Sequence, residues 1–551
     1  MKRAVAIAVI AILGFGVYAN SLSGQFIWDD EALVRDNAYI RNPGNLAKIF
    51  TGDIASGAAH KSGFYRPLQM LTYMIDYSFS KLESRTYHLT NVILHILAAL
   101  SLYWFINSLF GNSMLSFFVS VLFVVHPVHT GAVSYVSGRA DSLALLFMLL
   151  TFVFYVKGLR LAALSYALAL LSKETALILP LLLLLRDGSG VEYRPVPKGD
   201  RPIFNSRTVP IFIITGAYVL LRLTVLRPLL SHVPHSTTLL QRLPGFFVAI
   251  TSYIRLLFFP FDLHMEYGNK IFSFSYPGAI VGMAITAALL AFAFIRRKKD
   301  SLTFFSITWF FIALMPVSNL YPINAYMAEH WLYLPSIGFF ILAANGLKLL
   351  YEKKTYRIPG MIIFIAATTG FSYLTIKQNT YWKDPVSFYE ATLKHSPSNA
   401  RVLNRLGMAH DARGERKKAV AFYKQAIAVN PSYPNTYVNL GSAYKNMGNT
   451  KDAILAFEKA IQLDPGLPEA YNNLGIIYSA EGRHEKAMAL YEKAIEVNPQ
   501  YGYAYNNLAN AYKDMGKLDK AIPLYKKALD LVADKDVIRG NLERATRALN
   551  R

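Results

Sequence analysis

Two adjacent carboxylates, Asp29 and Asp30, are the side chains of this sequence whose placement most clearly suits chemistry. They end the sequence FIWDD at residues 26–30 and follow the first long apolar run, which begins at Ala4. A carboxylate can act as a general base toward a hydroxyl group. A second carboxylate beside it can share the proton, orient the acceptor or hold a divalent cation such as Mg²⁺ or Mn²⁺. The pair could also be a solvated acidic turn or a helix cap.

Charged side chains also stand at the ends of other apolar runs. A charge at membrane depth is costly unless it is paired or functional. A phosphate leaving group needs cations, and arginine offers it bidentate hydrogen bonds. The cations that could bind such a phosphate are Arg66, Arg139 and Lys173, and the polar groups that could support them are Asp141, Glu174 and Glu329. Simpler explanations stay open, because Arg139 and Asp141 could cap a helix or form an ion pair, and Lys173 could pair with Glu174.

Metal and thiol chemistry find little support in the sequence. There is no cysteine, which excludes disulfides, thiolate metal sites and a cysteine nucleophile. His126 and His129 have a spacing that weakly resembles a metal site. We expect them to be hydrogen-bonded histidines at a helix interface, and we predict no zinc site. Apart from the divalent cation considered above, the sequence indicates no cofactor.

Long apolar runs must position these residues. The chain has 551 residues, 53% of them hydrophobic, and a mean hydropathy of +0.27, which are high values for a soluble protein. The net charge of +22 resides largely in short basic loops between apolar runs, as in cytoplasmic loops of membrane proteins, so we expect no nucleic acid partner. Runs of about 18 residues predict membrane-spanning helices. These lie near residues 4–22, 88–110, 113–127, 138–157, 208–228, 277–295, 302–318, 335–350 and 358–377.

Two shorter runs and one interrupted run complete this region. Residues 160–172 and 174–187 are predicted to be short spans, which gives about eleven spans in all. Residues 246–261 contain Arg255 and are predicted to form a re-entrant or interfacial helix. The basic loops place the N-terminus inside and the loops 23–87, 128–137, 229–276 and 319–334 outside. The basic start of the chain resembles a signal peptide, but we expect the first span to be retained.

The rest of the chain reads as soluble and repeats every 34 residues, a spacing kept by Pro397, Pro431, Pro465 and Pro499. Glycine, alanine and aromatic residues recur with the same period and match the tetratricopeptide pattern. In such repeats, small residues let paired helices approach and proline ends each unit. We predict a linker and half repeat at 378–399, four repeats at 400–534 and a capping helix at 535–551.

Asparagine recurs at one position in the first helix of successive repeats, at Asn439, Asn473 and Asn507. A tetratricopeptide array forms a concave groove that suits an extended peptide, and asparagine can bind peptide backbone without reading side chains. We therefore predict a peptide-binding groove. The alternative is that asparagine is simply common at this repeat position.

Several segments together resemble the transmembrane and tetratricopeptide-repeat O-mannosyltransferases and their bacterial relatives, which belong to the GT-C glycosyltransferase superfamily. The segments are FIWDD at 26–30, YRPL at 65–68, HLTNVILH at 88–95, HPVHT at 126–130, GRAD at 138–141, SKE at 172–174 and AEHWLYLPS at 328–336. The resemblance covers nearly the whole chain. It implies an all-α fold with a polytopic GT-C domain at 1–377, followed by the tetratricopeptide-repeat solenoid. It also implies a bacterial inner membrane protein with a cytoplasmic N-terminus and a periplasmic or extracytoplasmic repeat domain.

The resemblance further implies an activity. It is the inverting transfer of a sugar, mannose or another hexose, from a polyprenyl-phosphate carrier to Ser or Thr of exported proteins. Carried over, Asp29 is the general base, and Asp30 helps to position the acceptor or the donor. Basic residues at span ends hold the lipid phosphate, and the repeats present the acceptor polypeptide.

One residue departs from the family pattern. The family usually has arginine after the glutamate that matches Glu329, whereas this chain has His330. A neutral histidine cannot stabilise a leaving phosphate as arginine does. Either His330 is protonated beside the phosphate, or Arg66, Arg139 or Lys173 carries more of that task.

Other functions remain open at this point. The same fold could glycosylate a lipid or glycan, and polysaccharide polymerases or ligases can also carry such repeats. Those enzymes usually have their large catalytic loop late among the spans, whereas the longest outer loop here comes first. A non-catalytic scaffold for envelope assembly is the remaining alternative, and it predicts that Asp29→Asn changes nothing.

Overall fold

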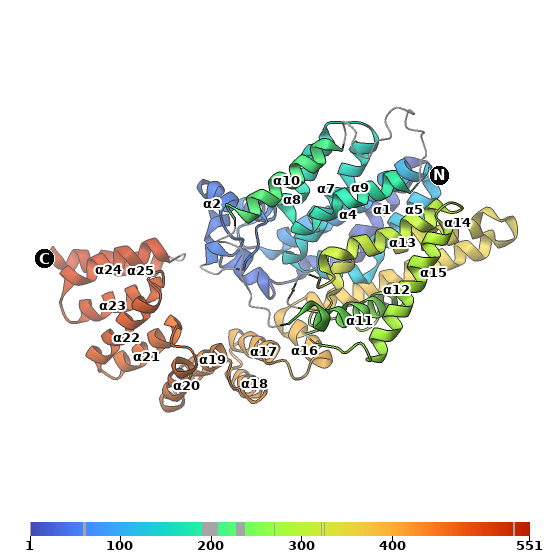
Figure 1. Ribbon diagram of the computed structural model, residues 1–551. Coiled ribbons are helices and arrows are strands. Elements are labelled where there is room, and N and C mark those ends of the chain that lie inside the picture. The colour runs from blue at the N-terminus through green and yellow to red at the C-terminus, as the bar shows by residue number, and fades with distance from the viewer. Residues whose placement is uncertain are drawn as a thin grey trace. The chain divides into compact units, whose positions relative to one another are not determined.

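The computed structural model describes residues 2–58, 62–189, 208–226, 237–268, 270–320, 322–323, 325–532 and 535–550, which form helices and loops without a strand (Figure 1). They group into two compact units, Met1–Ser387 and Phe388–Arg551. The all-α class predicted from the sequence is therefore confirmed. The boundary between the units falls inside the segment 378–399, and the domain end predicted at residue 534 lies outside the described residues.

Among the described residues, five helices are long and apolar enough to cross a membrane. Their main parts are α1 (Arg3–Tyr18), α4 (Ser84–Phe110), α7 (Arg139–Val156), α12 (Pro277–Arg296) and α15 (Arg357–Asn379). A further span could be made by α5 (Ser113–Val125) and the turns up to α6 (Thr130–Val133), which bend by 56° at the break. The roughly eleven spans predicted from the sequence also include apolar runs too short to meet this length criterion, so the total number of membrane crossings stays a prediction. Residues 227 and 228 of the predicted span 208–228 lie outside the described residues.

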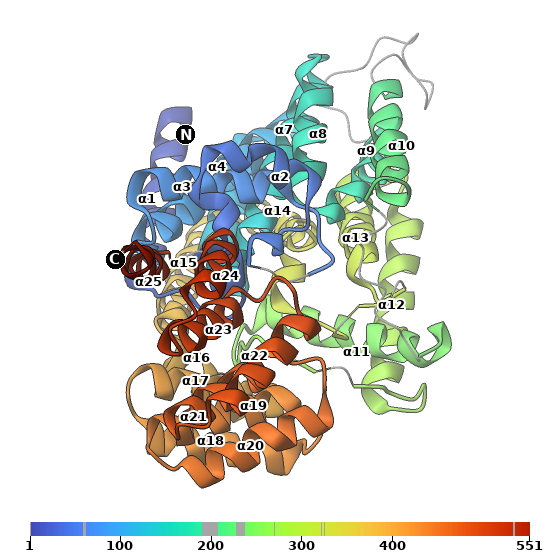
Figure 2. The ribbon, with the colours of Figure 1, turned by 90° about the vertical axis from the view of Figure 1, so that its left-hand side faces the viewer.

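Shorter helices complete the first unit. They are α2 (Leu46–Thr51), α3 (Pro67–Ser80), α8 (Leu161–Ser172), α9 (Leu179–Gly188), α10 (Val209–Leu223), α11 (Leu239–Phe258), α13 (Ser301–Leu314) and α14 (Ser336–Glu352), and α16 (Pro385–His395) crosses the boundary between the units. Figure 2 shows α11 lying across the direction of α12, against which it packs. Residues 246–258 of the run 246–261 belong to α11, and the interfacial placement of the run stays a prediction.

An aromatic cluster lies in the middle of the membrane bundle. The rings of Phe105, Phe152 and Trp309 come from α4, α7 and α13, with centroids 4.8 to 5.5 Å apart. All three side chains are buried, and tilted packing of this kind adds about 0.5–1.5 kcal/mol per pair beyond area burial. The cluster therefore fixes the central helices that end near the candidate site.

The segment between α1 and α4 is compact. It buries its own apolar cluster, which includes Leu33, Ile40, Ile54 and Met70. The carboxylate of Asp53 closes the segment by accepting backbone N–H groups of residues 55, 62, 63 and 64. The acidic pair thus stands on an ordered structure, because buried apolar contacts and a satisfied carboxylate both resist local opening.

The second unit consists of helix pairs. They are α17 (Ala400–Ala412) with α18 (Arg416–Val429), α19 (Pro434–Asn446) with α20 (Thr450–Leu463), α21 (Pro468–Ala480) with α22 (His484–Val497) and α23 (Gly502–Asp514) with α24 (Leu518–Leu531), followed by α25 (Asp536–Leu549).

Two classes of repeating glycine explain the period. Gly448 and its equivalents end the first helix of each pair with φ between 73° and 78°, which favours glycine. Gly441 lies where a Cβ would come within 2.8 Å of the Phe457 ring, so the two helices of the pair can approach only without a side chain.

Candidate functional site

The acidic pair directly follows a residue with a strained backbone. Trp28 has φ of 57°, a left-handed conformation that costs a residue with a Cβ about 1–2 kcal/mol. Asp29, which follows it, is exposed, whereas Asp30 is only 1% exposed. Strained backbone persists where the surroundings over-determine it and often marks a functional site. The turn therefore gives the two carboxylates different surroundings and different possible roles.

Asp30 is held inside by protein donors. One carboxylate oxygen accepts the N–H of Ser137 at 2.7 Å and also its hydroxyl, and the other accepts the N–H of Ile27 at 3.1 Å. Burial raises the pKa of Asp30 to about 7, although these hydrogen bonds act in the opposite direction. With both oxygens occupied, Asp30 is suited to fixing the turn and poorly suited to taking a proton from a substrate or holding a cation.

Asp29 is held through its backbone. Its N–H donates to the hydroxyl of Tyr135 at 3.1 Å. The Tyr135 ring stacks on Trp382, with centroids 5.3 Å apart and an angle of 26° between the planes. Asp29 is therefore an exposed residue whose backbone is held by Tyr135, next to a residue whose side chain is fixed inside the protein.

Four charged residues predicted from three separate segments meet as two ion pairs. Arg66 donates two hydrogen bonds to the carboxylate of Glu174, at 3.0 and 2.6 Å. Lys173 donates to Asp141 at 2.6 Å. All four side chains are largely buried, with exposed fractions between 7% and 26%. Burial favours a lower pKa for Arg66, but the electrostatic attraction of Glu174, and next of Asp141, raises its pKa.

His330 belongs to the same cluster. Burial lowers the pKa of His330 to about 4, with Asp141 opposing the shift and the cations of Lys173 and Arg66 adding to it. His330 also lies near Trp382, because a Cβ at Gly131 would stand 3.8 Å from the Cβ of His330 and 3.8 Å from Cζ2 of Trp382. The Trp382 ring thus contacts Tyr135, the residue that holds Asp29, and lies near His330 of the charged cluster.

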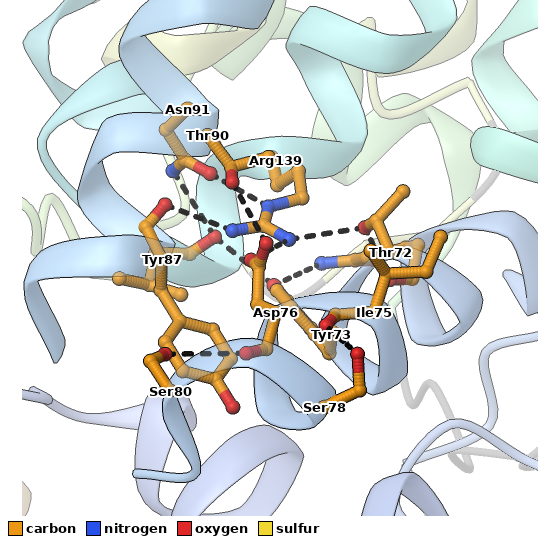
Figure 3. Close-up of polar contacts among 12 residues, drawn as sticks. Thr72, Tyr73, Ile75, Asp76, Ser78, Ser80, Tyr87, Thr90, Asn91 and Arg139 are labelled. Atoms are coloured by element: carbon orange, nitrogen blue, oxygen red, sulfur yellow. Dashed lines mark hydrogen bonds and ion pairs between the residues drawn. The ribbon is translucent and has the colours of Figure 1, made fainter. Parts of the chain in front are cut away.

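Arg139 is placed elsewhere. It is 0% exposed and pairs with Asp76 at 2.6 Å, as Figure 3 shows. Its remaining N–H groups reach Asn91, Thr72 and the carbonyl of Tyr87. Residues two apart on a helix face different sides, so Arg139 and Asp141 of α7 serve different neighbours. Its enclosure favours a structural role for Arg139 over binding of the donor phosphate.

Glu329 also turns away from the cluster. It is 5% exposed and accepts the N–H of His264 and the hydroxyl of Tyr267, the latter at 2.6 Å. Burial raises the pKa of Glu329 to about 8. Glu329 therefore ties the loop after α11 to the turn that carries His330, which is support for the site rather than contact with a substrate.

The histidines of the HPVHT segment bond within the protein. His126 contacts the carbonyl of Leu257 at 3.1 Å, and His129 contacts the carbonyl of Phe123 and the hydroxyl of Ser336. Within the described residues, no group of three His, Asp or Glu side chains is arranged to hold a metal ion.

The three predicted asparagines of the repeats already form hydrogen bonds within the repeat unit. Asn439 donates to Asn404 at 3.0 Å and Asn507 donates to Asn472 at 2.8 Å, each in the preceding repeat. Asn473 donates to a backbone carbonyl and accepts from the ammonium of Lys445 at 2.7 Å. All three are half-buried, so these bridges use part of their hydrogen-bonding capacity.

Comparison with known proteins identifies the repeats of the second unit. Residues 434–467, 468–501 and 502–532 match the tetratricopeptide repeat, and residues 411–448 match a related repeat of the same class. The second unit is a tetratricopeptide-repeat array. Solved repeat proteins are similar to it, among them MamA, at 32% identity over 26% of this chain and 85% of that one with a TM-score of 0.24. Another is the repeat protein TTC0263 of Thermus thermophilus, at 21% identity over 38% of this chain and 98% of that one with a TM-score of 0.27.

Longer similarities cover about 70% of the chain. The protein O-mannosyl-transferase TMTC3 of Homo sapiens is 27% identical over 71% of this chain and 48% of its own length. A protein O-mannosyl-transferase of Caenorhabditis elegans is 26% identical over 73% of this chain and 59% of its own length. The resemblance stated from the sequence motifs is confirmed by these homologues, and the chain spans about half the length of the curated relatives it matches.

Proposed function

We propose that this chain is a glycosyltransferase that works at the outer face of the inner membrane and moves a sugar, mannose or another hexose, from a polyprenyl-phosphate carrier to Ser or Thr of exported polypeptides. The observation that carries the proposal is the exposed residue Asp29 on a turn fixed by Asp30 and Tyr135. The names of the homologues, protein O-mannosyl-transferases, support the reaction class.

Asp29 acts as the general base. It takes the proton of the acceptor hydroxyl while the acceptor oxygen forms a bond to the anomeric carbon of the sugar. The bond between that carbon and the phosphate oxygen breaks, and its electron pair leaves with the polyprenyl phosphate. A single displacement inverts the anomeric carbon, and a positioned base contributes about 10²–10⁴ to such a rate.

Arg66 and Lys173 stabilise the leaving phosphate. Their carboxylate partners Glu174 and Asp141 hold the two cations in place before the donor arrives. The bidentate geometry of arginine suits a phosphate as well as a carboxylate, so the donor can compete with Glu174 for Arg66. His330 contributes as a neutral group, since its pKa is low in this cluster.

The tetratricopeptide repeats bind the acceptor polypeptide. The half-buried Asn439, Asn473 and Asn507 retain acceptor or donor capacity after their bridges to neighbouring residues, and an extended backbone can use it. With membrane lipid and the lipid-linked donor, this gives the partners of an inner membrane enzyme whose N-terminus is cytoplasmic and whose repeats are extracytoplasmic.

The test compares glycopeptides of exported proteins by mass spectrometry in cells with the wild-type chain, Asp29→Asn, Asp36→Asn or no copy. Asp36 is an exposed carboxylate of the same loop that pairs with Arg35, so it controls for a lost charge. A Ser- or Thr-linked sugar should vanish with Asp29→Asn and without the chain, and persist with Asp36→Asn. If exported proteins look identical in all cells, protein is not the acceptor, and a lipid or glycan acceptor or a scaffold takes its place.

A further inference from the structure

The short segment between α6 and α7 is held rigidly by buried side chains. Asn91, which is 0% exposed, directs its amide N–H groups at the carbonyls of Val133, Tyr135 and Val136, at 3.1, 3.0 and 3.3 Å. The amide oxygen of Asn91 accepts from Arg139 at 2.7 Å, which fixes the orientation of the amide. A fully satisfied buried amide of this kind holds one conformation, because leaving any of its groups unpaired is costly.

Further polar contacts hold the same segment. The Tyr73 hydroxyl donates to the carbonyl of Val136 at 3.0 Å, and Gln69 donates to the carbonyl of Ser137 at 3.0 Å. Ser134 donates to Asn379 of α15 at 2.7 Å. The segment is therefore tied to α3, α4 and α15 at once, and it can serve as a fixed support for the residue it carries.

That residue is Tyr135. Its ring is 6% exposed and stacked on Trp382, and its hydroxyl accepts the N–H of Asp29. The next residues of the same segment bind Asp30 through Ser137. Both members of the acidic pair are thus hydrogen-bonded to the same rigid segment. These bonds help to hold the strained backbone of Trp28, which would otherwise relax to a more common conformation.

We propose that Tyr135 is a positioning residue, which holds the Asp29 backbone so that the Asp29 carboxylate faces the acceptor hydroxyl. This inference rests on the proposed role of Asp29 as general base. Tyr135 does not touch the reacting atoms in it. It acts by fixing the backbone of the residue that does, and small misplacements of a catalytic group cost about 10- to 100-fold in rate.

The first test measures position without activity. Hydrogen–deuterium exchange of the full-length chain follows the amide of Asp29 in Tyr135→Phe, with Tyr73→Phe as the matched control. Tyr73→Phe removes a phenol hydroxyl that binds the same segment but not Asp29. Exchange at Asp29 should be at least about tenfold faster in Tyr135→Phe only, because the amide has lost its acceptor. Equal exchange in wild type and Tyr135→Phe would overturn the proposal.

The second test measures the consequence. Transfer from polyprenyl-phosphate mannose to a threonine peptide is followed in wild type, Tyr135→Phe, Asp29→Asn and the double variant. Tyr135→Phe should lower kcat about tenfold with an unchanged KM for the donor, and it should change nothing further in the Asp29→Asn background. An unchanged kcat, or an equal loss in both backgrounds, contradicts the positioning role.

These outcomes separate the two proposals. If Asp29→Asn keeps the wild-type rate, the proposed function fails, whereas the exchange measurement still decides whether Tyr135 holds Asp29. If Tyr135→Phe fails to fold, Trp382→Leu removes the ring beneath Tyr135 and is read by both measurements. It should move exchange and kcat in the same directions, and no change in either would overturn the proposal.

Discussion

His330→Gln tests the charge state of the cluster. The pKa of His330 is lowered to about 4, so at pH 7 about one molecule in a thousand carries a proton there. The two cations and two carboxylates around it then sum to zero formal charge. A nearby phosphate raises a histidine pKa by about 1–2 units, which still leaves His330 mostly neutral at pH 7.

Two substitutions of His330 should therefore have different effects on the donor KM at pH 7. His330→Gln replaces one neutral polar group by another and should change the donor KM by less than about threefold. His330→Arg adds a permanent positive charge and should lower the donor KM about fivefold, since a partly exposed pair contributes about 1 kcal/mol.

The affinity for the donor should also depend on pH, in a direction set by the pKa of His330. Donor binding raises the pKa of His330 and so takes up a proton, and the affinity for polyprenyl phosphate should increase as the pH falls from 7 to 5. His330→Gln should remove that increase. The assay is binding of polyprenyl phosphate to the full-length chain in detergent across this pH range. A tenfold loss of affinity in His330→Gln at pH 7 would refute the reasoning, because it would show a charged His330.

Three further variants test other parts of the site. Arg66→Gln should raise the donor KM at least about tenfold, whereas Arg35→Gln, in an exposed pair of the same loop, should leave it unchanged; equal donor KM values would remove Arg66 from the phosphate site. Arg139→Met leaves Asp76 buried without its partner and should cost about 3–5 kcal/mol of stability in thermal unfolding, with a normal donor KM in the folded fraction. A raised donor KM would instead return Arg139 to the phosphate site. Because the pKa of Asp30 is raised to about 7 in the folded chain, its contribution to stability is present at pH 4 and is lost as the pH rises toward 7. Asp30→Asn should flatten the pH dependence of thermal unfolding over that range, and an unaltered slope would contradict the assignment.

The sequence predicted the architecture where a period or a long apolar run encodes it. The repeats follow from Gly441 and Gly448 and their equivalents, whose packing and turn requirements recur every 34 residues. Arg66, Lys173 and His330 were predicted from three separate segments, and the fold brings them into one cluster.

Other features depend on details that residue spacing does not carry. Asp29 and Asp30 are chemically alike, and their different exposure depends on the left-handed backbone of Trp28 and on the donors of Ser137 and Ile27 that hold Asp30 inside. Tyr135 and Trp382 were missed because each is an ordinary aromatic residue after a span, and their stacking joins segments about 250 residues apart.

The central claim is that Asp29 takes the acceptor proton, and the most direct measurement is kcat of purified Asp29→Asn beside Asp36→Asn. Both variants should bind the donor within about twofold of wild type, since neither residue contacts the phosphate cluster in this account. The account predicts that Asp29→Asn alone loses about 10²–10⁴ in kcat. A kcat for Asp29→Asn within a few fold of Asp36→Asn would contradict it.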